Sequence, residues 1–197
     1  MKQQLQQYNE ILVETNKLFN LTAHKTIDQS WKLNIEDSLL FNDEIAKFFK
    51  QGAKVADIGS GSGSPSIPLK ISFPHIHMTL IESITKKAKF LQSVIEELKL
   101  KDIQVANMRC EDFSKLNKGI IDIVTARAVA PLDTLVKLAM PLLKRGGILL
   151  AYKGKNYQEE IKTAKHTMSR LGAKIIATEI KQLEEDSTRV MLVIKKS

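Results

Sequence analysis

The chain has 197 residues, and its 30 lysines and arginines against 22 aspartates and glutamates give a formal net charge of +8. Hydrophobic residues make up 43% and charged residues 26%, a balance that excludes intrinsic disorder, collagen-like repeats and disulfide-rich scaffolds. The single cysteine, Cys110, cannot form an internal disulfide, which fits a reducing compartment. No apolar run approaches the roughly 20 residues that a membrane span needs, so we expect a soluble, cytoplasmic protein with no membrane partner.

Residues 1–50 contain no glycine or proline, and their apolar positions recur at helical spacing. One face of a first helix is predicted to carry Tyr8, Leu12, Thr15 and Phe19. Later helical turns are predicted around Trp31, Ile35, Leu39, Phe41, Ile45, Phe48 and Phe49. We therefore expect residues 1–50 to be a helical extension that packs on a main domain formed by residues 51–197.

Beyond residue 51, short apolar runs alternate with amphipathic stretches. The runs are near-continuous, which favours strands buried on both faces of a parallel sheet. They lie at 54–58, 77–82, 103–107, 120–125 and 147–152, and helices are predicted at 85–100, 131–143 and 156–171. Strands at 174–180 and 188–195, joined by a short acidic loop, are predicted to form a C-terminal antiparallel hairpin. The chain is therefore predicted to be an α/β domain with a helical N-terminal extension.

The densest chemical signal is the segment 55–71, in which a buried strand ends and a glycine-rich turn follows. Gly59, Gly61 and Gly63 suit a turn that needs positive φ or a close approach of backbone to a ligand. Pro65 is predicted to open the helix that follows. In an open α/β sheet this turn lies at the carboxyl edge of the strands, where ligands bind.

The spacing of the glycines favours one class of ligand. A dinucleotide fingerprint would need glycine at position 64, where Ser64 stands. Asp57, two residues before the first glycine, suits a ligand with a positive end. Glu82 ends the second predicted strand, where a carboxylate can accept both hydroxyls of an adenosine ribose. S-adenosylmethionine fits this description, and the alternative is a flexible glycine turn beside a solvated Glu82.

Further candidate site residues follow other predicted strands. Cys110 and Glu111 come after the third strand and are candidates to contact the adenine, unless the segment is an ordinary acidic loop. Arg127 follows the fourth strand, Lys153 follows the fifth, and Arg189 begins the last. At one edge of the sheet these cations would suit phosphates or the electron-rich edge of guanine. The alternative is three unrelated surface cations.

Other catalytic patterns are missing from the sequence. The four histidines are scattered and there is one cysteine, so no zinc ligand set is present and no metal is expected. The sequence contains neither a G-x-S-x-G nucleophile motif nor a G-x-x-x-x-G-K-[ST] phosphate loop. We assign no nucleophile and no general base.

Together these residues resemble the class I S-adenosylmethionine-dependent methyltransferases. More narrowly, they resemble the bacterial small-subunit ribosomal RNA methyltransferase G family, also called glucose-inhibited division protein B. The resemblance covers nearly the whole chain and rests on residues 19–22, 37–38, 57–63, 65, 67–69, 82–83, 86–87, 109–111, 125–128, 153–154 and 189. Three segments narrow the resemblance from the superfamily to this family: I-P-L at 67–69, A-R-A at 126–128 and N-L-T at 20–22.

The resemblance implies a Rossmann-like fold with a mostly parallel, seven-stranded sheet and helices on both faces. It implies transfer of a methyl group to N7 of a guanosine in the 530 loop of 16S rRNA, within the small subunit or an assembly intermediate. The implied cofactor site involves Gly59, Ser64, Glu82, Cys110, Glu111 and Arg127. Asn34 and Ser66 depart from the family pattern, which usually has histidine and glycine at these positions.

The implied reaction needs no general base before the attack, because N7 of guanine has a free lone pair and carries no proton. Arg127, Lys153 and Arg189 are expected to position the guanine and its phosphates. Flanking phosphate contacts are expected from Lys25, Lys32, Lys86, Lys87 and Lys155. The alternatives are a methyltransferase that acts on another RNA or a small molecule, and a non-catalytic RNA-binding module that binds S-adenosylmethionine. No long apolar seam is left over, so we expect a monomer.

Overall fold

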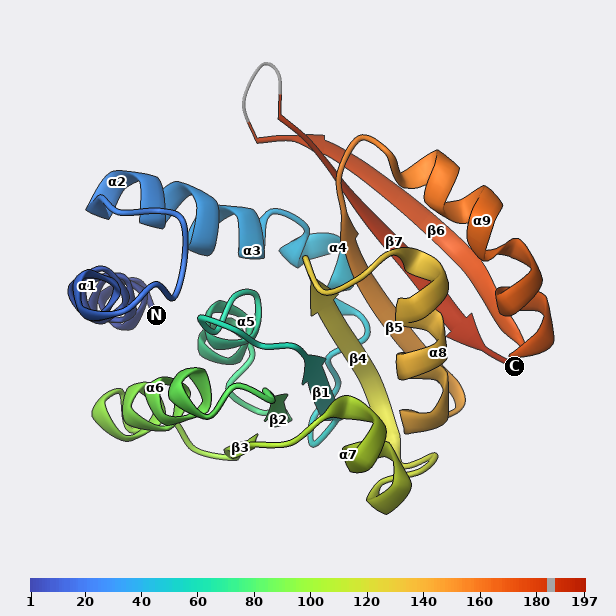
Figure 1. Cartoon of the computed structure of the whole chain (residues 1–197), viewed down its shortest axis with the longest axis horizontal. Coiled ribbons are helices and arrows are strands. Elements are labelled where there is room, and N and C mark those ends of the chain that lie inside the picture. The colour runs from blue at the N-terminus through green and yellow to red at the C-terminus, as the bar shows by residue number, and fades with distance from the viewer. Residues whose placement is uncertain (184–186) are drawn as a thin grey trace.

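The computed structural model describes residues 1–183 and 187–197, which form a seven-stranded sheet flanked by helices (Figure 1). All the predicted strands are present: β1 (Lys54–Ile58), β2 (His77–Ile81), β3 (Ile103–Ala106), β4 (Ile121–Arg127), β5 (Leu143–Lys153), β6 (Ala173–Gln182) and β7 (Thr188–Lys196). Residues 184–186, which belong to the predicted acidic loop between the last two strands, lie outside the described residues.

The helices of the N-terminal segment are short after the first one. They are α1 (Lys2–Leu18), α2 (Ile27–Ser30), the π-helix η1 (Trp31–Glu36), α3 (Asp37–Leu39) and α4 (Asn42–Ala46). On α1, Tyr8 and Leu12 are buried as predicted, whereas Thr15 is half-buried and Phe19 lies beyond the helix end. The boundary at residue 50 between an extension and a main domain stays a prediction.

The main part of the chain contains α5 (Ser66–Ser72), α6 (Thr85–Glu97), α7 (Cys110–Leu116), α8 (Leu132–Leu142) and α9 (Tyr157–Arg170). Helix α7 was not predicted from the sequence, because its seven residues are too few for a clear apolar stripe. Arg109 is extended at its N-cap, and Glu111 and Asp112 lie in its first turn, where acidic side chains favour a helix start. Cys110 and Glu111 therefore begin a helix.

The strand order is β3-β2-β1-β4-β5-β7-β6. Strands β1 to β5 pair in parallel, and β7 is antiparallel to both β5 and β6. The chain builds outward from β1 in one direction and from β4 in the other, so β1 and β4 are the switch point of the sheet. Ligands bind outside the carboxyl ends of the strands at such a point.

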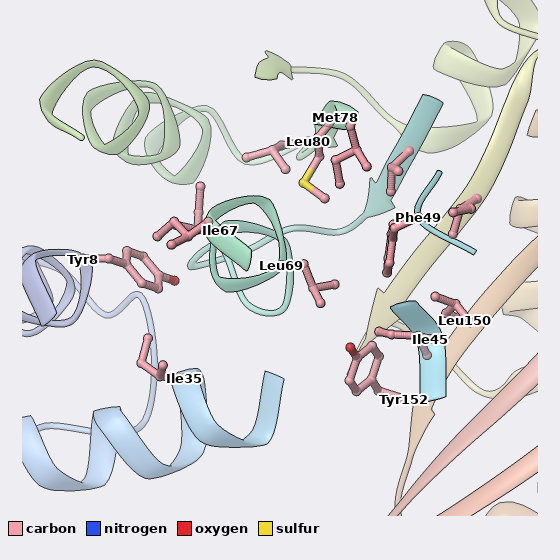
Figure 2. Close-up of a cluster of buried hydrophobic side chains, with 14 of the residues drawn as sticks. Tyr8, Ile35, Ile45, Phe49, Ile67, Leu69, Met78, Leu80, Leu150 and Tyr152 are labelled. Carbon is pink, nitrogen blue, oxygen red and sulfur yellow. The ribbon is translucent and has the colours of Figure 1, made fainter. Parts of the chain in front are cut away.

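Alternate residues of the strands feed two separate apolar cores. Val55 and Met78 belong to the core on the face covered by α1, α4, α5 and α6, part of which is drawn in Figure 2. Ala56 and Ile81 belong to the core on the opposite face, covered by α7, α8 and α9. Helices on both faces explain why the strand sequences are near-continuous apolar runs. Among the described residues, no helix is both long and apolar enough to cross a membrane.

Candidate functional site

A cavity of about 890 Å³ opens at the carboxyl edge of the sheet, beside the switch point. Its wall comes from the turns after β1 and β4, the end of β5, the start of β7 and residues between Leu21 and Phe41 of the N-terminal segment. The predicted site residues that line it are Gly59, Gly61, Ser64, Arg127, Lys153 and Arg189. One cavity therefore joins the glycine turn to the three predicted cations.

The glycine turn after β1 packs tightly on α1 and α5. Gly63 has a φ of +96°, and a Cβ there would lie 2.8 Å from Cγ1 of Ile67 and 3.0 Å from the Tyr8 hydroxyl oxygen. The Tyr8 hydroxyl donates a hydrogen bond of 2.8 Å to the Ser62 carbonyl, and burial holds the pKa of Tyr8 above its ordinary value. Figure 2 shows the Tyr8 side chain extending from α1 toward α5. Glycine at position 63 is therefore required by both backbone conformation and space.

Asp57 lies beneath the glycine turn and does not line the cavity. Its side chain is buried, and its two carboxylate oxygens accept hydrogen bonds from the hydroxyls of Ser66, at 2.8 Å, and Thr125, at 2.6 Å. Burial raises the pKa of Asp57, and the hydroxyl donors oppose that shift. Ser66, which departs from the family pattern, is the first residue of α5. Asp57 thus joins β1, β4 and α5, and its direct contact with a cationic ligand stays a prediction.

Glu82 follows β2 and supports the turn from the other side. Its carboxylate accepts the N–H of Gly61 at 2.8 Å and the N–H of Ile84 at 2.7 Å. Cys110 is buried, which raises the pKa of its thiol to about 12, and Glu111 is exposed. None of Glu82, Cys110 and Glu111 lines the cavity, so their contacts with a ligand stay predictions.

Arg127 and Arg189 meet at a single carboxylate, that of Asp37. Nη1 of Arg127 lies 3.0 Å from Oδ2 of Asp37, and Nε of Arg189 lies 2.8 Å from Oδ1. The exposed fraction of the Asp37 side chain is 9%, against 17% for Arg127 and 27% for Arg189. The wall of the cavity therefore holds two positive charges bridged by one negative charge.

Lys153 supports the turn that follows β4. Its Nζ lies 2.6 Å from Oε2 of Glu160 and donates to the Ala130 carbonyl at 2.9 Å. The same Glu160 oxygen accepts the N–H of Leu132, the first residue of α8. Within this turn Ala128 has a φ of +56°, a left-handed conformation that costs free energy for a residue with a Cβ. Lys153 and Glu160 thus hold a strained turn in place, and contact of Lys153 with substrate stays a prediction.

The flanking lysines differ in their surroundings. Lys87 lines the cavity, and Nζ of Lys86 lies 4.2 Å from the centre of the Phe19 ring. Lys25 and Lys155 are exposed, whereas Lys32 is half-buried on η1. Lys87 is therefore the one of these five that lies at the cavity wall, and phosphate contacts of the set stay predictions.

Four titratable residues that line the cavity had no role predicted from the sequence: His24, Asp37, Tyr152 and Glu160. The sequence did mark Asp37, because residues 37–38 are among the segments on which the family resemblance rests. No sequence pattern marked Glu160 as a site residue, because an acidic residue on the polar side of an amphipathic helix is ordinary. Burial and the nearby Arg127 lower the pKa of His24. Within residues 1–183 and 187–197, no group of His, Cys, Asp and Glu side chains is arranged to hold a metal ion.

Comparison with known proteins decides the family. A family model described as rRNA small subunit methyltransferase G matches residues 1–191. The proteins named ribosomal RNA small subunit methyltransferase G from Ligilactobacillus salivarius (strain UCC118) and Staphylococcus aureus (strain JH9) are 37% and 38% identical to this chain. The alignments cover 98% and 99% of this chain and 82% of each relative. The chain belongs to the rRNA small subunit methyltransferase G family.

Solved structures agree on the fold of this member of the methyltransferase G family. TYW2 of P. horikoshii, in complex with MeSAdo, has a TM-score of 0.66 at 21% identity, over 83% of this chain and 63% of that one. TYW2 of M. jannaschii, in complex with AdoMet, has a TM-score of 0.61 at 18% identity, over 79% of this chain and 76% of that one. The predicted Rossmann-like class I methyltransferase fold is confirmed.

Proposed function

We propose that this protein transfers a methyl group from S-adenosylmethionine to N7 of a guanosine in the 530 loop of 16S rRNA. The observation that carries the proposal is the cavity that joins the glycine turn to Arg127, Lys153 and Arg189 at the carboxyl edge of the sheet. Membership of the rRNA small subunit methyltransferase G family supports both the reaction and the RNA substrate.

The residues at the turn fit S-adenosylmethionine. The cavity passes Gly59 and Gly61, where the lack of a side chain leaves backbone open to a ligand. A volume of about 890 Å³ lies within the usual range for small-molecule sites, which is roughly 300–1,000 Å³. Glu82 is held against the turn by the N–H of Gly61, so its carboxylate lies beside the place where a ribose would bind. When bound, S-adenosylmethionine supplies an electrophilic methyl group on a sulfonium.

The chain itself has to align two reactants. Because N7 of guanine already presents a lone pair, no residue has to remove a proton before the methyl group is attacked. Arg127 and Arg189 present guanidinium groups on the cavity wall, where they are suited to bind guanine O6 or phosphate oxygens. The reaction is then accelerated by proximity and orientation, so no side chain has to act as a nucleophile.

We further propose that the target is presented within the small ribosomal subunit or an assembly intermediate, that the protein acts as a monomer, and that it is cytoplasmic. The +8 charge supports contact with RNA phosphates beyond the target nucleotide. The basic side chains around the cavity, among them Lys87, support approach of the RNA to this edge of the sheet.

Methylation with labelled S-adenosylmethionine tests the proposal. Undermethylated small subunits and naked 16S rRNA are incubated with the protein, and the modified nucleotide is mapped. Label is expected as N7-methylguanosine in the 530 loop, and the preferred substrate distinguishes free RNA from an assembled particle. Label on another base, or no label on any RNA, would show the proposal to be wrong.

Two measurements separate the alternatives. Binding of single-stranded RNA through several phosphates should weaken with a log–log salt slope of about −0.7 per contact, whereas a small-molecule methyltransferase should show no such RNA binding. R127A is compared with R145A, because Arg145 is an exposed arginine on β5 that does not line the cavity. Loss of RNA binding in R127A alone, with unchanged cofactor affinity and no turnover by the wild-type protein, would favour the non-catalytic module.

A further inference from the structure

Asp37 is the point at which two strands and the N-terminal segment meet. Its carboxylate contacts Arg127 of β4 through Oδ2 and Arg189 of β7 through Oδ1. Strands β4 and β7 are not neighbours, because β5 lies between them in the sheet. The side chain of Asp37 is 9% exposed, and the residue lines the cavity. This carboxylate therefore bridges two cations across an intervening strand.

Electrostatics makes the arrangement of the two arginines depend on that carboxylate. Guanidinium groups that share one partly buried wall repel each other, and the repulsion grows as water is excluded. The single negative charge of Asp37 is shared between the two guanidinium groups, so a net charge of +1 is left for a ligand. Without the carboxylate, Arg127 and Arg189 are expected to separate and to sample several rotamers.

The π-helical turn of η1 provides a second contact to the guanidinium of Arg127. The N–H of Asp37 donates to the carbonyl of Lys32, five residues earlier, whereas in an α-helix it would donate to Leu33. The Leu33 carbonyl accepts a hydrogen bond of 2.9 Å from Nη1 of Arg127. The wide turn thus places a backbone carbonyl and the Asp37 carboxylate on one arginine.

The same segment also contacts the glycine turn. The Asn34 carbonyl accepts the Ser64 hydroxyl at 3.2 Å and also accepts the hydroxyl of Ser38. Oδ1 of Asn34 lies 3.5 Å from Nη2 of Arg127. Residues 33–37 therefore hold Arg127 through the Leu33 carbonyl and Arg189 through the Asp37 carboxylate, next to the turn that would hold the cofactor.

We propose that Asp37 is a positioning residue for methyl transfer. It holds Arg127 and Arg189 in one arrangement, so that together they bind acceptor oxygens of the target nucleotide and aim its N7 at the methyl group. This inference rests on the proposed function. Asp37 acts through the arginines and needs no contact of its own with the RNA. A misplacement of the reactants by roughly 1 Å can slow a reaction about 100-fold, which is the scale of the expected effect.

The test replaces Asp37 by asparagine, which keeps the size of the side chain and removes its charge. For D37N we expect kcat to fall about 10- to 100-fold, because the reactants are less well aligned. The Kd for RNA should stay within about twofold of the wild type or become tighter, because a negative charge has been removed from a basic surface. The matched control is D28N, since Asp28 is an exposed residue of α2 in the same segment and its replacement changes the charge equally. D28N should match the wild type in kcat.

Cofactor affinity and the melting temperature are measured for each variant. If D37N does not fold, D37E carries the test, because it keeps the charge but displaces the carboxylate by one methylene group. For D37E we also expect a lower kcat with unchanged RNA affinity. A variant that folds and keeps the wild-type kcat would refute the inference, as would a loss of RNA affinity that accounts for the whole loss of activity. A wild-type protein that methylates no RNA would instead refute the proposed function.

Discussion

Replacing Gly63 by alanine tests whether α1 and α5 set the shape of the glycine turn. Gly63 has a φ of +96°, and an added Cβ would lie 2.8 Å from Ile67, 3.0 Å from the Tyr8 hydroxyl oxygen and 3.1 Å from Leu91. The matched control is G119A. Gly119 also has a positive φ, of +70°, but an added Cβ there would have no heavy atom within 4 Å.

The expected difference follows from these contacts. A left-handed conformation costs a residue with a Cβ about 1–2 kcal/mol, and both variants carry that cost. The smaller entropy of the unfolded chain after a glycine-to-alanine change is also common to both. Overpacking, which applies only at Gly63, costs about 1–3 kcal/mol. The free energy of unfolding of G63A should therefore be about 2 kcal/mol below that of G119A, which corresponds to a melting temperature lower by roughly 4–8 °C.

Thermal unfolding is followed by circular dichroism, with and without S-adenosylmethionine. Because the clash lies at the turn, G63A should also lose most of the rise in melting temperature that the cofactor produces, whereas G119A should keep it. Equal melting temperatures for the two variants would refute the packing argument. A destabilised G63A that keeps full cofactor stabilisation would show that the turn can shift without affecting the ligand site.

Three further predictions concern the side chains of Tyr8, Cys110 and Asp57. Y8F removes the hydrogen bond to the Ser62 carbonyl, so the free energy of unfolding should fall by about 1 kcal/mol and the melting temperature by roughly 2–4 °C; no change would mean that water replaces the hydroxyl. Burial raises the pKa of the Cys110 thiol to about 12, so iodoacetamide at pH 8 should modify it only after unfolding, and rapid modification of the folded protein would contradict that burial. Burial raises the pKa of Asp57 above its ordinary value of 3.8, so the folded state binds this proton more tightly than the unfolded state. The stability that Asp57 contributes is therefore complete below pH 3.8 and is lost as the pH rises through the folded-state pKa. D57N should show a smaller loss of stability across that range in urea unfolding, and an unchanged pH dependence would contradict the sign.

Most of the fold could be predicted from local patterns. The apolar runs predicted the inner strands because residues buried on both faces must be apolar wherever the strand lies in the sheet. The edge strands β3 and β6 were also predicted, although neither is buried on both faces. Gly59, Gly61 and Gly63 predicted a turn with positive φ, and all three have a positive φ in the structure. Helix α7 was missed because seven residues give too little periodicity, and the π-helical turn of η1 has no sequence signal comparable to a glycine or a proline.

The roles of the charged residues were harder to predict. Arg127, Lys153 and Arg189 were placed at the cavity because each adjoins the same edge of a predicted sheet. Their partners were not foreseen. Lys153 forms an ion pair with Glu160 of α9, so its positive charge is partly neutralised within the wall of the cavity.

By itself, the sequence determined the strands, the glycine turn and the basic charge of this protein, because these depend on residue type and on spacing between near neighbours. The tertiary structure alone decided that Asp37 joins Arg127 and Arg189, from which it is separated by 90 and 152 residues. It also decided that Tyr8 reaches Ser62 across 54 residues. Contacts of this kind arise only when the sheet has formed and its faces are covered, since the long intervening chain carries no local pattern that specifies which side chains meet.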